Sequence, residues 1–237
     1  MLPSVAANTL WAALPADEQD LLAPDLRSRF FTRGDVLIVA HDAVATLYFP
    51  IDAKLADVMV LADGRASCVS SVGRQGVAGL AGFLAEEPLA WNVEVHVGGL
   101  GYALPAAALR RRLDENPALL TLFNRSNHER HVEAAQNAAC AAAGHSALSR
   151  VARWLLIAQD CTGSAAIRIS QEEVARHLSL RRTTVTAAAA ALKSAGACSY
   201  LRERIVIERR DLLQSYACDC YRDLSERRIR APAEHVA

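Results

Sequence analysis

Short apolar runs separated by turn residues fill most of the chain up to about residue 105. The Asp63-Gly64 pair between two such runs is a strong hairpin signal, because both residues tolerate a positive φ. Gly34-Asp35 marks a second turn, and Pro50 ends a short aromatic run. The pattern predicts a compact sandwich or barrel-like roll, preceded by a small helical segment at residues 16–26. The predicted strands lie within residues 30–39, 47–49, 55–61, 68–72 and 91–97.

Beyond residue 105 the apolar positions take a helical period. A short helix is expected at residues 106–113, and a long helix follows Pro117 and runs to about residue 143. The second half of the long helix is mostly alanine, which lets two helix backbones approach closely, so we interpret it as a dimer seam. Packing within its own chain is the alternative. The residues expected at the dimer interface are Leu119, Phe123, Asn127, Arg130, Ala134, Ala138 and Ala141.

The last third of the chain has the pattern of a winged helix-turn-helix. Ser170 and Glu173 have capping-box spacing, so a helix should open at Gln171. A turn at Ser179-Leu180 separates it from a second helix, which begins near Arg181 and stops at Gly196. Residues 197–207 predict a hairpin with a charged tip, which would be the wing.

This arrangement suits the recognition of DNA bases. A recognition helix presents its N-terminal residues in the major groove, where Arg182 can donate two hydrogen bonds to guanine, worth about 1–3 kcal/mol of discrimination. Backbone N–H groups at the start of the first helix suit a phosphate. A helical hairpin that only packs is the alternative. The residues expected to contact DNA are Ser170, Gln171, Arg181, Arg182, Thr183, Thr184, Thr186, Lys193, Arg202 and Arg204.

Charge is distributed unevenly, although the whole chain has 26 basic and 26 acidic residues. From Ala147 onward 15 basic and 10 acidic residues give +5, and the preceding residues, with 11 basic and 16 acidic, give −5. The basic part is therefore the part expected to meet a polyanion. The chain has neither an apolar run of about 18 residues nor a secretory signal pattern, so we expect a cytoplasmic protein with no membrane partner.

Candidate catalytic and metal-binding patterns are missing from the sequence. No Ser-His-Asp set, carboxylate pair or phosphate loop stands out, so we expect no catalytic residue, no enzyme activity and no cofactor. The six cysteines are scattered and are expected to be reduced thiols. Cys218 and Cys220 form a C-x-C pair, which is poor spacing for a closed zinc site without further ligands nearby, and the histidines show no close metal pattern. No metal site is therefore predicted.

Taken together, these motifs resemble the Crp/Fnr superfamily of bacterial transcription regulators. The resemblance is carried by residues 169–175, 182–185 and 192–196, and by residues 48–50, 63–65 and 72–79 in the first half. It implies an α+β protein: a cyclic-nucleotide-binding-like β-roll sensor domain at residues 1–115, a dimerisation helix at 116–144 and a winged helix-turn-helix domain at 145–237. It further implies a homodimeric, sequence-specific transcription regulator that binds double-stranded DNA, with RNA polymerase as a further candidate partner.

Several positions depart from the pattern of this superfamily. Members that bind cyclic AMP have a glutamate directly after the glycine that corresponds to Gly76, whereas this chain has Val77. They also have an arginine in the segment that corresponds to residues 88–91, which contains none here. We therefore expect no response to cyclic AMP, and the effector stays unknown. The first cysteine is Cys68, which disfavours an N-terminal iron–sulfur cluster. Ser179 and Glu203 stand where relatives commonly have glycine.

The recognition helix also departs from the family pattern, because residues 187–191 are all alanine. This run leaves an alternative open. The chain could be an effector-sensing regulator that acts mainly through protein contacts with a weakened DNA-binding domain.

Overall fold

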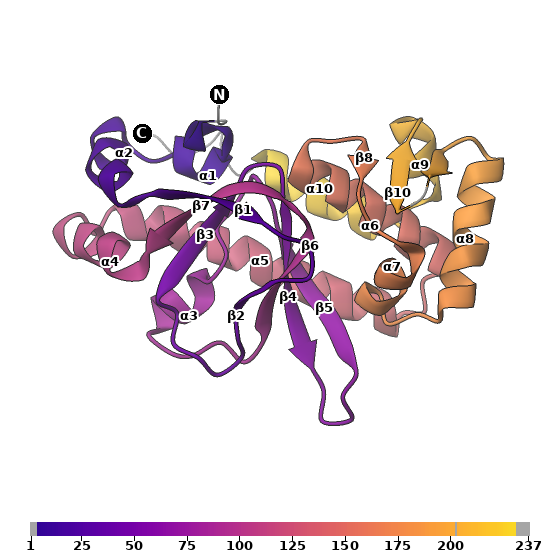
Figure 1. Ribbon diagram of the computed structural model, residues 1–237, viewed down its shortest axis with the longest axis horizontal. Coiled ribbons are helices and arrows are strands. Elements are labelled where there is room, and N and C mark those ends of the chain that lie inside the picture. The colour runs from indigo at the N-terminus through magenta and orange to yellow at the C-terminus, as the bar shows by residue number, and fades with distance from the viewer. Residues whose placement is uncertain (1–3, 202, 231–237) are drawn as a thin grey trace.

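The computed structural model describes residues 4–201 and 203–230, the last four through their backbone only. A β-rich N-terminal part and a mainly helical C-terminal part lie side by side, and one long helix runs along both (Figure 1). This is the α+β architecture expected from the sequence. None of the described helices is long and apolar enough to span a bilayer.

The N-terminal part is a roll of two antiparallel sheets, entered through the short segments η1 (Val5–Ala7), α1 (Thr9–Ala12), α2 (Ala16–Leu22) and η2 (Ala23–Asp25). The first sheet has the order β1 (Arg27–Phe31), β7 (Gly99–Pro105), β3 (Thr46–Pro50). The second has the order β2 (Val36–Ile38), β6 (Asn92–Val97), β4 (Lys54–Val60), β5 (Ala66–Val72). Helix α3 (Leu80–Ala85) lies between β5 and β6 in the chain.

The expected turns appear, but one of them has a different role. Gly64 has a φ of +81° in the turn between β4 and β5, which pair as the predicted antiparallel hairpin. Gly34 also has a positive φ, yet the strands on either side of it do not pair with each other. Instead, β1 pairs with β7 and β2 pairs with β6, so this turn carries the chain from one sheet to the other.

Aromatic side chains fill the interior of the roll. Trp11 packs edge-on against Phe49 with ring centroids 5.6 Å apart, and Phe31 packs edge-on against Tyr48 at 5.9 Å. Such pairs add to the stabilisation that comes from burying apolar area. After β7, α4 (Ala106–Glu115) leads into the long helix α5 (Leu119–Ala142).

Helix α5 corrects part of the predicted dimer seam. Leu119 is 3% exposed and Phe123 is fully buried, and both pack in the apolar core with Trp11 and Phe49 of the same chain. Arg130 pairs with Asp57 of β4. These three side chains are therefore used within the protomer, because the roll covers the most apolar face of α5.

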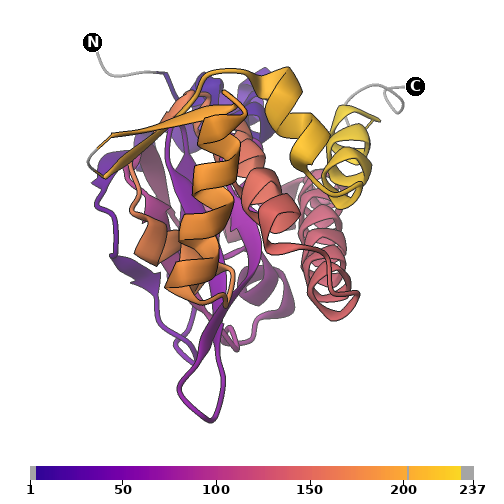
Figure 2. The ribbon, with the colours of Figure 1, turned by 90° about the vertical axis from the view of Figure 1, so that its right-hand side faces the viewer.

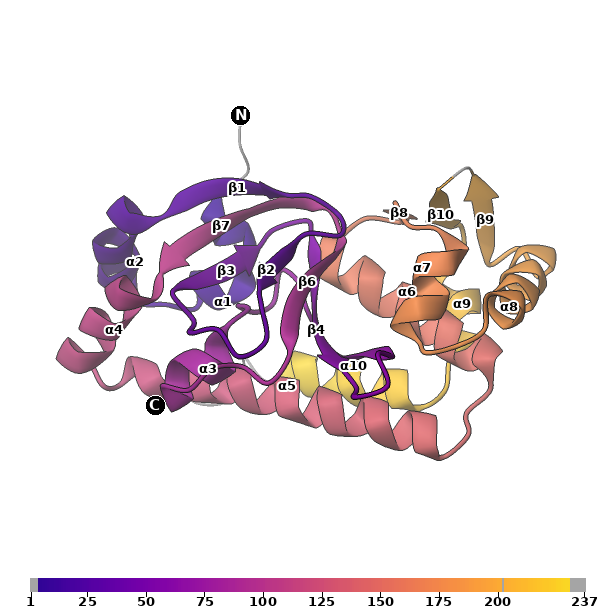
Figure 3. The same ribbon diagram turned by 60° about the horizontal axis from the view of Figure 1, so that its bottom comes forward.

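The C-terminal part is a helical domain with a small three-stranded sheet. Helix α6 (Ala147–Thr162) opens with the Ser146 side chain accepting from the Ser149 N–H, the cap expected from the sequence. The following elements are β8 (Ala166–Ile167), α7 (Gln171–His177), α8 (Arg182–Ser194), β9 (Cys198–Leu201), β10 (Arg204–Ile207), α9 (Arg210–Tyr216) and α10 (Cys220–Arg230). The sheet order is β8-β10-β9. In Figure 2 this domain faces the viewer, with α8 at its outer side, and Figure 3 shows α10 lying along α5.

Candidate DNA-binding surface

The first helix of the helix-turn-helix begins at a complete capping box. The Ser170 hydroxyl accepts from the Glu173 N–H at 3.2 Å, and the Ser170 N–H donates to the Glu173 carboxylate at 2.9 Å. This reciprocal pair satisfies two N–H groups that a helix start otherwise leaves without partners. Ser170 therefore has a structural role, and its N–H, which the sequence led us to expect at a phosphate, already donates to Glu173.

A tight turn joins α7 to the recognition helix α8. Ser179 has a φ of +52°, the left-handed region that glycine adopts most easily, and the Leu180 N–H donates to the Ala175 carbonyl at 2.9 Å. Glu203 at the wing turn likewise has a φ of +55°. Both positions thus have the backbone conformation for which relatives commonly use glycine.

Helix α8 has one buried face and one exposed face. Val185, Ala188, Ala189 and Leu192 are buried against the rest of the domain. Arg181, Thr183, Thr186 and Lys193 are exposed, the Arg182 side chain is 72% exposed, and Thr184 is half-buried. The predicted base-reading residues therefore share the free side of one helix. Its N-cap residue Arg181 makes no side-chain cap hydrogen bond.

Two polar contacts connect α7 to this exposed face. The Thr186 hydroxyl donates to the Gln171 side-chain oxygen at 2.9 Å, and Arg182 lies 3.8 Å from the Glu172 carboxylate. The Arg182 pair is exposed on both sides and is worth little in water, so the guanidinium can exchange it for a base or phosphate. The two helices of the motif thus place Gln171, Arg182 and Thr186 together.

The predicted wing is formed by β9 and β10, which pair in the register Arg204 to Leu201. Arg204 is half-buried, and Leu201 is 62% exposed. Arg202 lies outside the described residues.

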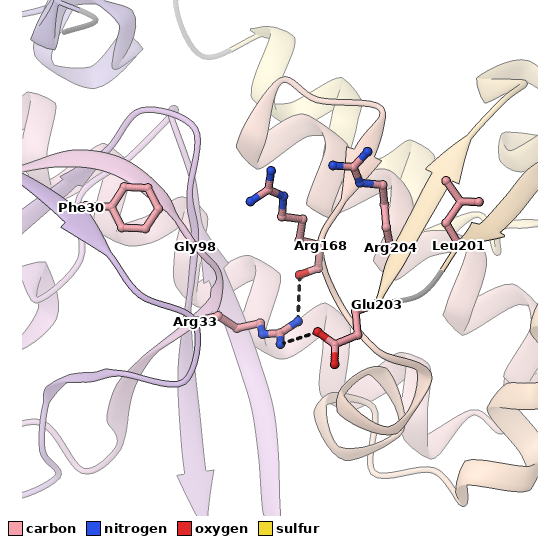
Figure 4. Close-up of a pocket in the computed structure, with 7 residues that line it drawn as sticks. All are labelled: Phe30, Arg33, Gly98, Arg168, Leu201, Glu203 and Arg204. Atoms are coloured by element: carbon pink, nitrogen blue, oxygen red, sulfur yellow. Dashed lines mark hydrogen bonds and ion pairs between the residues drawn. The ribbon is translucent and has the colours of Figure 1, made fainter.

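An arginine from the roll holds both the helix-turn-helix and the wing. Arg33, in the loop after β1, lies 3.2 Å from the Glu173 carboxylate and 3.4 Å from that of Glu203, and donates to the Arg168 carbonyl at 3.4 Å. Figure 4 shows Arg33 reaching from the roll toward Arg168 and Glu203 at the edge of a cavity of about 560 Å³. The sequence pattern gave no indication of this contact.

A second junction between the two parts is a group of buried basic and aromatic side chains, which we call the histidine cluster: Lys54, His96, Trp154 and His177. The His96 and His177 rings stack at 3.4 Å, and Lys54 Nζ lies 3.5 Å from His96 Nδ1 and 5.0 Å from the centre of the Trp154 ring. Burial, followed by the charge of Lys54, lowers the pKa of His177 to about 2 and that of His96 well below its usual value. Both imidazoles are therefore neutral at physiological pH.

A cavity of about 210 Å³ lies between the roll and α5, lined by Asp57, Met59, Val69, Ser70, Ala81, Trp91, Asn127, Arg130, His131 and Ala134. Arg130 is the only arginine or lysine among these lining residues. It pairs with Asp57 and donates to the Val77 carbonyl at 2.9 Å. Asn127 and Ala134 belong to the cavity wall in this protomer, although the sequence placed them at a dimer interface.

Comparison with known proteins agrees with this geometry. Residues 149–216 match the model of the Crp-like helix-turn-helix domain. No curated protein sequence matches the chain.

Among solved structures, a CRP-family transcriptional regulator from Thermus thermophilus is similar with a TM-score of 0.64 at 20% identity, over 80% of this chain and 96% of its own. FixK2 from Bradyrhizobium japonicum has a TM-score of 0.65 at 14% identity, over 81% of this chain and 98% of its own. The c-di-GMP-responsive global regulator CLP from Xanthomonas campestris has a TM-score of 0.64 at 15% identity, over 82% of this chain and 100% of its own.

The identities are too low to carry more than the fold. The domain match adds the type of DNA-binding module, and the roll supplies the N-terminal half of the same architecture. The chain therefore has a Crp-like helix-turn-helix domain at residues 149–216 and the overall fold of these transcription regulators, with a cyclic-nucleotide-binding-like N-terminal domain.

Proposed function

We propose that this chain is a Crp/Fnr-type transcription regulator that binds DNA as a homodimer and reads bases with the N-terminal half of α8. The observation that carries the proposal is the two-sided character of that helix: its apolar face is buried, whereas Arg181, Arg182 and Thr183 are exposed at its start. The Arg182 guanidinium supplies two adjacent N–H donors for the O6 and N7 atoms of a guanine. Thr183 and Thr186 contact bases, thymine methyl groups or phosphates. Gln171, Thr184, Lys193 and Arg204 complete the proposed surface.

The homodimer proposal uses the free side of α5. Residues at spacings of three and four are exposed along its whole length: Thr121, Asn124, His128, His131, Ala135, Ala138 and Ala142. This spacing is the 3.5-residue repeat of a two-helix seam. Of the residues predicted from the sequence, Ala138 lies on this stripe and Ala141 is exposed beside it. The alanines of the second half would let the partner helix approach closely.

We also propose that cyclic AMP is not the effector. The cavity beside α5 has Arg130 as its only arginine or lysine, and the Asp57 carboxylate already neutralises it. A cyclic phosphate bound there would have to separate this pair or remain without a cationic partner, and either costs free energy. Isothermal titration with cyclic AMP should show no binding at micromolar concentrations, and micromolar binding would overturn this part of the proposal.

A gel shift with genomic fragments across a salt series tests DNA binding. Specific binding should weaken steeply with salt, because each phosphate contact releases counterions. Arg182→Ala should abolish specific binding and leave the weaker non-specific binding. Arg65→Ala removes an equally exposed arginine at the β4–β5 turn, with a side chain 78% exposed, and should bind like the wild type.

A second candidate function rests on the alanines of α8. Ala187, Ala190 and Ala191 are exposed, so the second half of the helix offers no polar side chain to bases before Lys193. A regulator of this kind would act mainly through protein contacts, RNA polymerase being one candidate partner. Absent or salt-insensitive binding in the same gel shift would favour it over sequence-specific recognition.

A further inference from the structure

Three cysteines and a histidine from separate segments meet near the end of α5. Cys140 lies in the last turn of that helix, His145 in the loop after it, and Cys218 and Cys220 at the junction of α9 and α10. Cys140 Sγ is 3.2 Å from His145 Nδ1 and 3.7 Å from Cys218 Sγ, and Cys220 Sγ is 3.6 Å from His145 Nδ1. All four atoms lie within 4.8 Å of one another. The structure thus supplies the nearby ligands that the C-x-C pair lacks in sequence, which corrects the premise on which no metal site was predicted.

These separations fit four ligands around one ion. Zinc binds cysteine sulfur at about 2.3 Å and histidine nitrogen at about 2.0–2.1 Å, so tetrahedral angles place two sulfurs about 3.8 Å apart and a sulfur about 3.6 Å from a nitrogen. The observed 3.7, 3.6 and 3.2 Å lie at or just below these values. Soft thiolates combined with imidazole favour zinc over magnesium or calcium, and three cysteines with one histidine are a usual donor set of structural zinc sites.

Arg153 of α6 is a second and independent indication. It is 5% exposed, and its Nη2 donates to the Asn137 side chain at 2.5 Å. Its Nε and Nη1 are buried without a hydrogen-bond partner among the residues that the structure describes. Its partner Asn137 lies one helical turn before Cys140 on α5, so the guanidinium is held beside the end of that helix.

The charge of a filled site would balance this arginine. A buried cation with unsatisfied donors is costly. Three thiolates and a neutral imidazole around a divalent zinc ion carry one net negative charge, and thiolate sulfurs accept N–H donors. A filled site therefore accounts for an arginine that otherwise has two buried nitrogens without acceptors among the described residues.

We propose that Cys140, His145, Cys218 and Cys220 bind one zinc ion in a closed structural site. The ion joins the start of α10 to the end of α5, across the loop that leads into the DNA-binding domain (Figure 3). It holds the last helix of that domain against the helix proposed for dimerisation. The site thereby fixes the position and orientation of the recognition helix relative to the dimer axis.

The metal content of the full-length chain, purified without a polyhistidine tag, tests the proposal. Mass spectrometry of the elements should find about one zinc per chain. Cys220→Ser and His145→Gln should each lose most of it while circular dichroism shows a folded protein. Cys68→Ser, a cysteine of β5 away from the cluster, is the matched control and should keep its zinc.

Two further measurements keep the result clear if a variant folds poorly. Removing the metal from the wild type with a strong chelator should lower Tm on the order of 10 °C, and zinc should restore it. Cobalt added to the stripped protein should give the intense visible bands of a tetrahedral thiolate site. A folded wild type with no metal, with iron in place of zinc, or with a Cys140–Cys218 disulfide would overturn the proposal.

Discussion

Acidification should weaken the junction at the histidine cluster. The pKa of His177 is about 2 in the folded protein, whereas an unfolded histidine titrates near 6.5. Below about pH 6.5 this histidine therefore binds a proton in the unfolded chain but not in the folded chain. The stability contributed by the neutral imidazole is complete above that pH and is lost progressively as the pH falls toward the folded pKa.

The size of the effect follows from this difference. Between pH 6.5 and 5 one such histidine lowers the free energy of unfolding by about 1.6 kcal/mol, because the unfolded histidine is half protonated at pH 6.5 and each pH unit well below that costs about 1.36 kcal/mol. His96, whose pKa is also lowered by burial, adds to this loss. Urea unfolding at several pH values, followed by tryptophan fluorescence at a fixed protein concentration, measures the loss.

A variant isolates the contribution of His177. His177→Phe keeps a flat ring against His96 and removes a buried Nδ1 that has no hydrogen-bond partner among the described residues. It should therefore remove about 1.6 kcal/mol of the loss between pH 6.5 and 5. His41→Asn, at an exposed turn with a φ of +71°, which asparagine tolerates, is the control. If His177→Phe and the wild type lose stability in parallel, the reasoning about this buried ring is refuted.

Three further predictions concern the core, the seam and the cap. Phe123→Ala should lower the free energy of unfolding by about 3–5 kcal/mol, and an unchanged urea midpoint would contradict its place in the core. Ala138→Arg should convert the dimer to monomers in analytical ultracentrifugation. Ala107→Arg, which changes an exposed residue of α4, is the control and should stay dimeric. A dimeric Ala138→Arg variant would argue against the α5 seam. Ser170→Ala should cost about 1 kcal/mol of stability in urea unfolding, and no loss would mean that the capping box is dispensable.

Features encoded by neighbouring residues could be predicted from the sequence. The capping box, the β4–β5 hairpin and the turn at Ser179 each depend on a few consecutive side chains, and the structure has all three. The α+β architecture and the helix-turn-helix followed from joining such local signals with the family resemblance. The Crp-like domain also agrees with the expectation of a regulator rather than an enzyme.

Features that depend on what covers a surface could not be predicted in the same way. The period of α5 shows which positions are apolar, but it does not say whether the roll or a second chain covers them, and Phe123 is covered by the roll. Cys140 and Cys218 are 78 positions apart, and Arg33 and Glu203 are 170 apart, so only the tertiary fold brings each pair together.

Footprinting with hydroxyl radicals, on a genomic fragment that the full-length protein selects, tests the central claim most directly. Two copies of α8 presented by a symmetric dimer should protect two matching segments about 34 Å apart, one turn of the duplex. Arg182→Ala should erase both segments together. A single protected segment, or protection that survives this substitution, would contradict recognition of DNA by the start of α8 in a symmetric pair of chains.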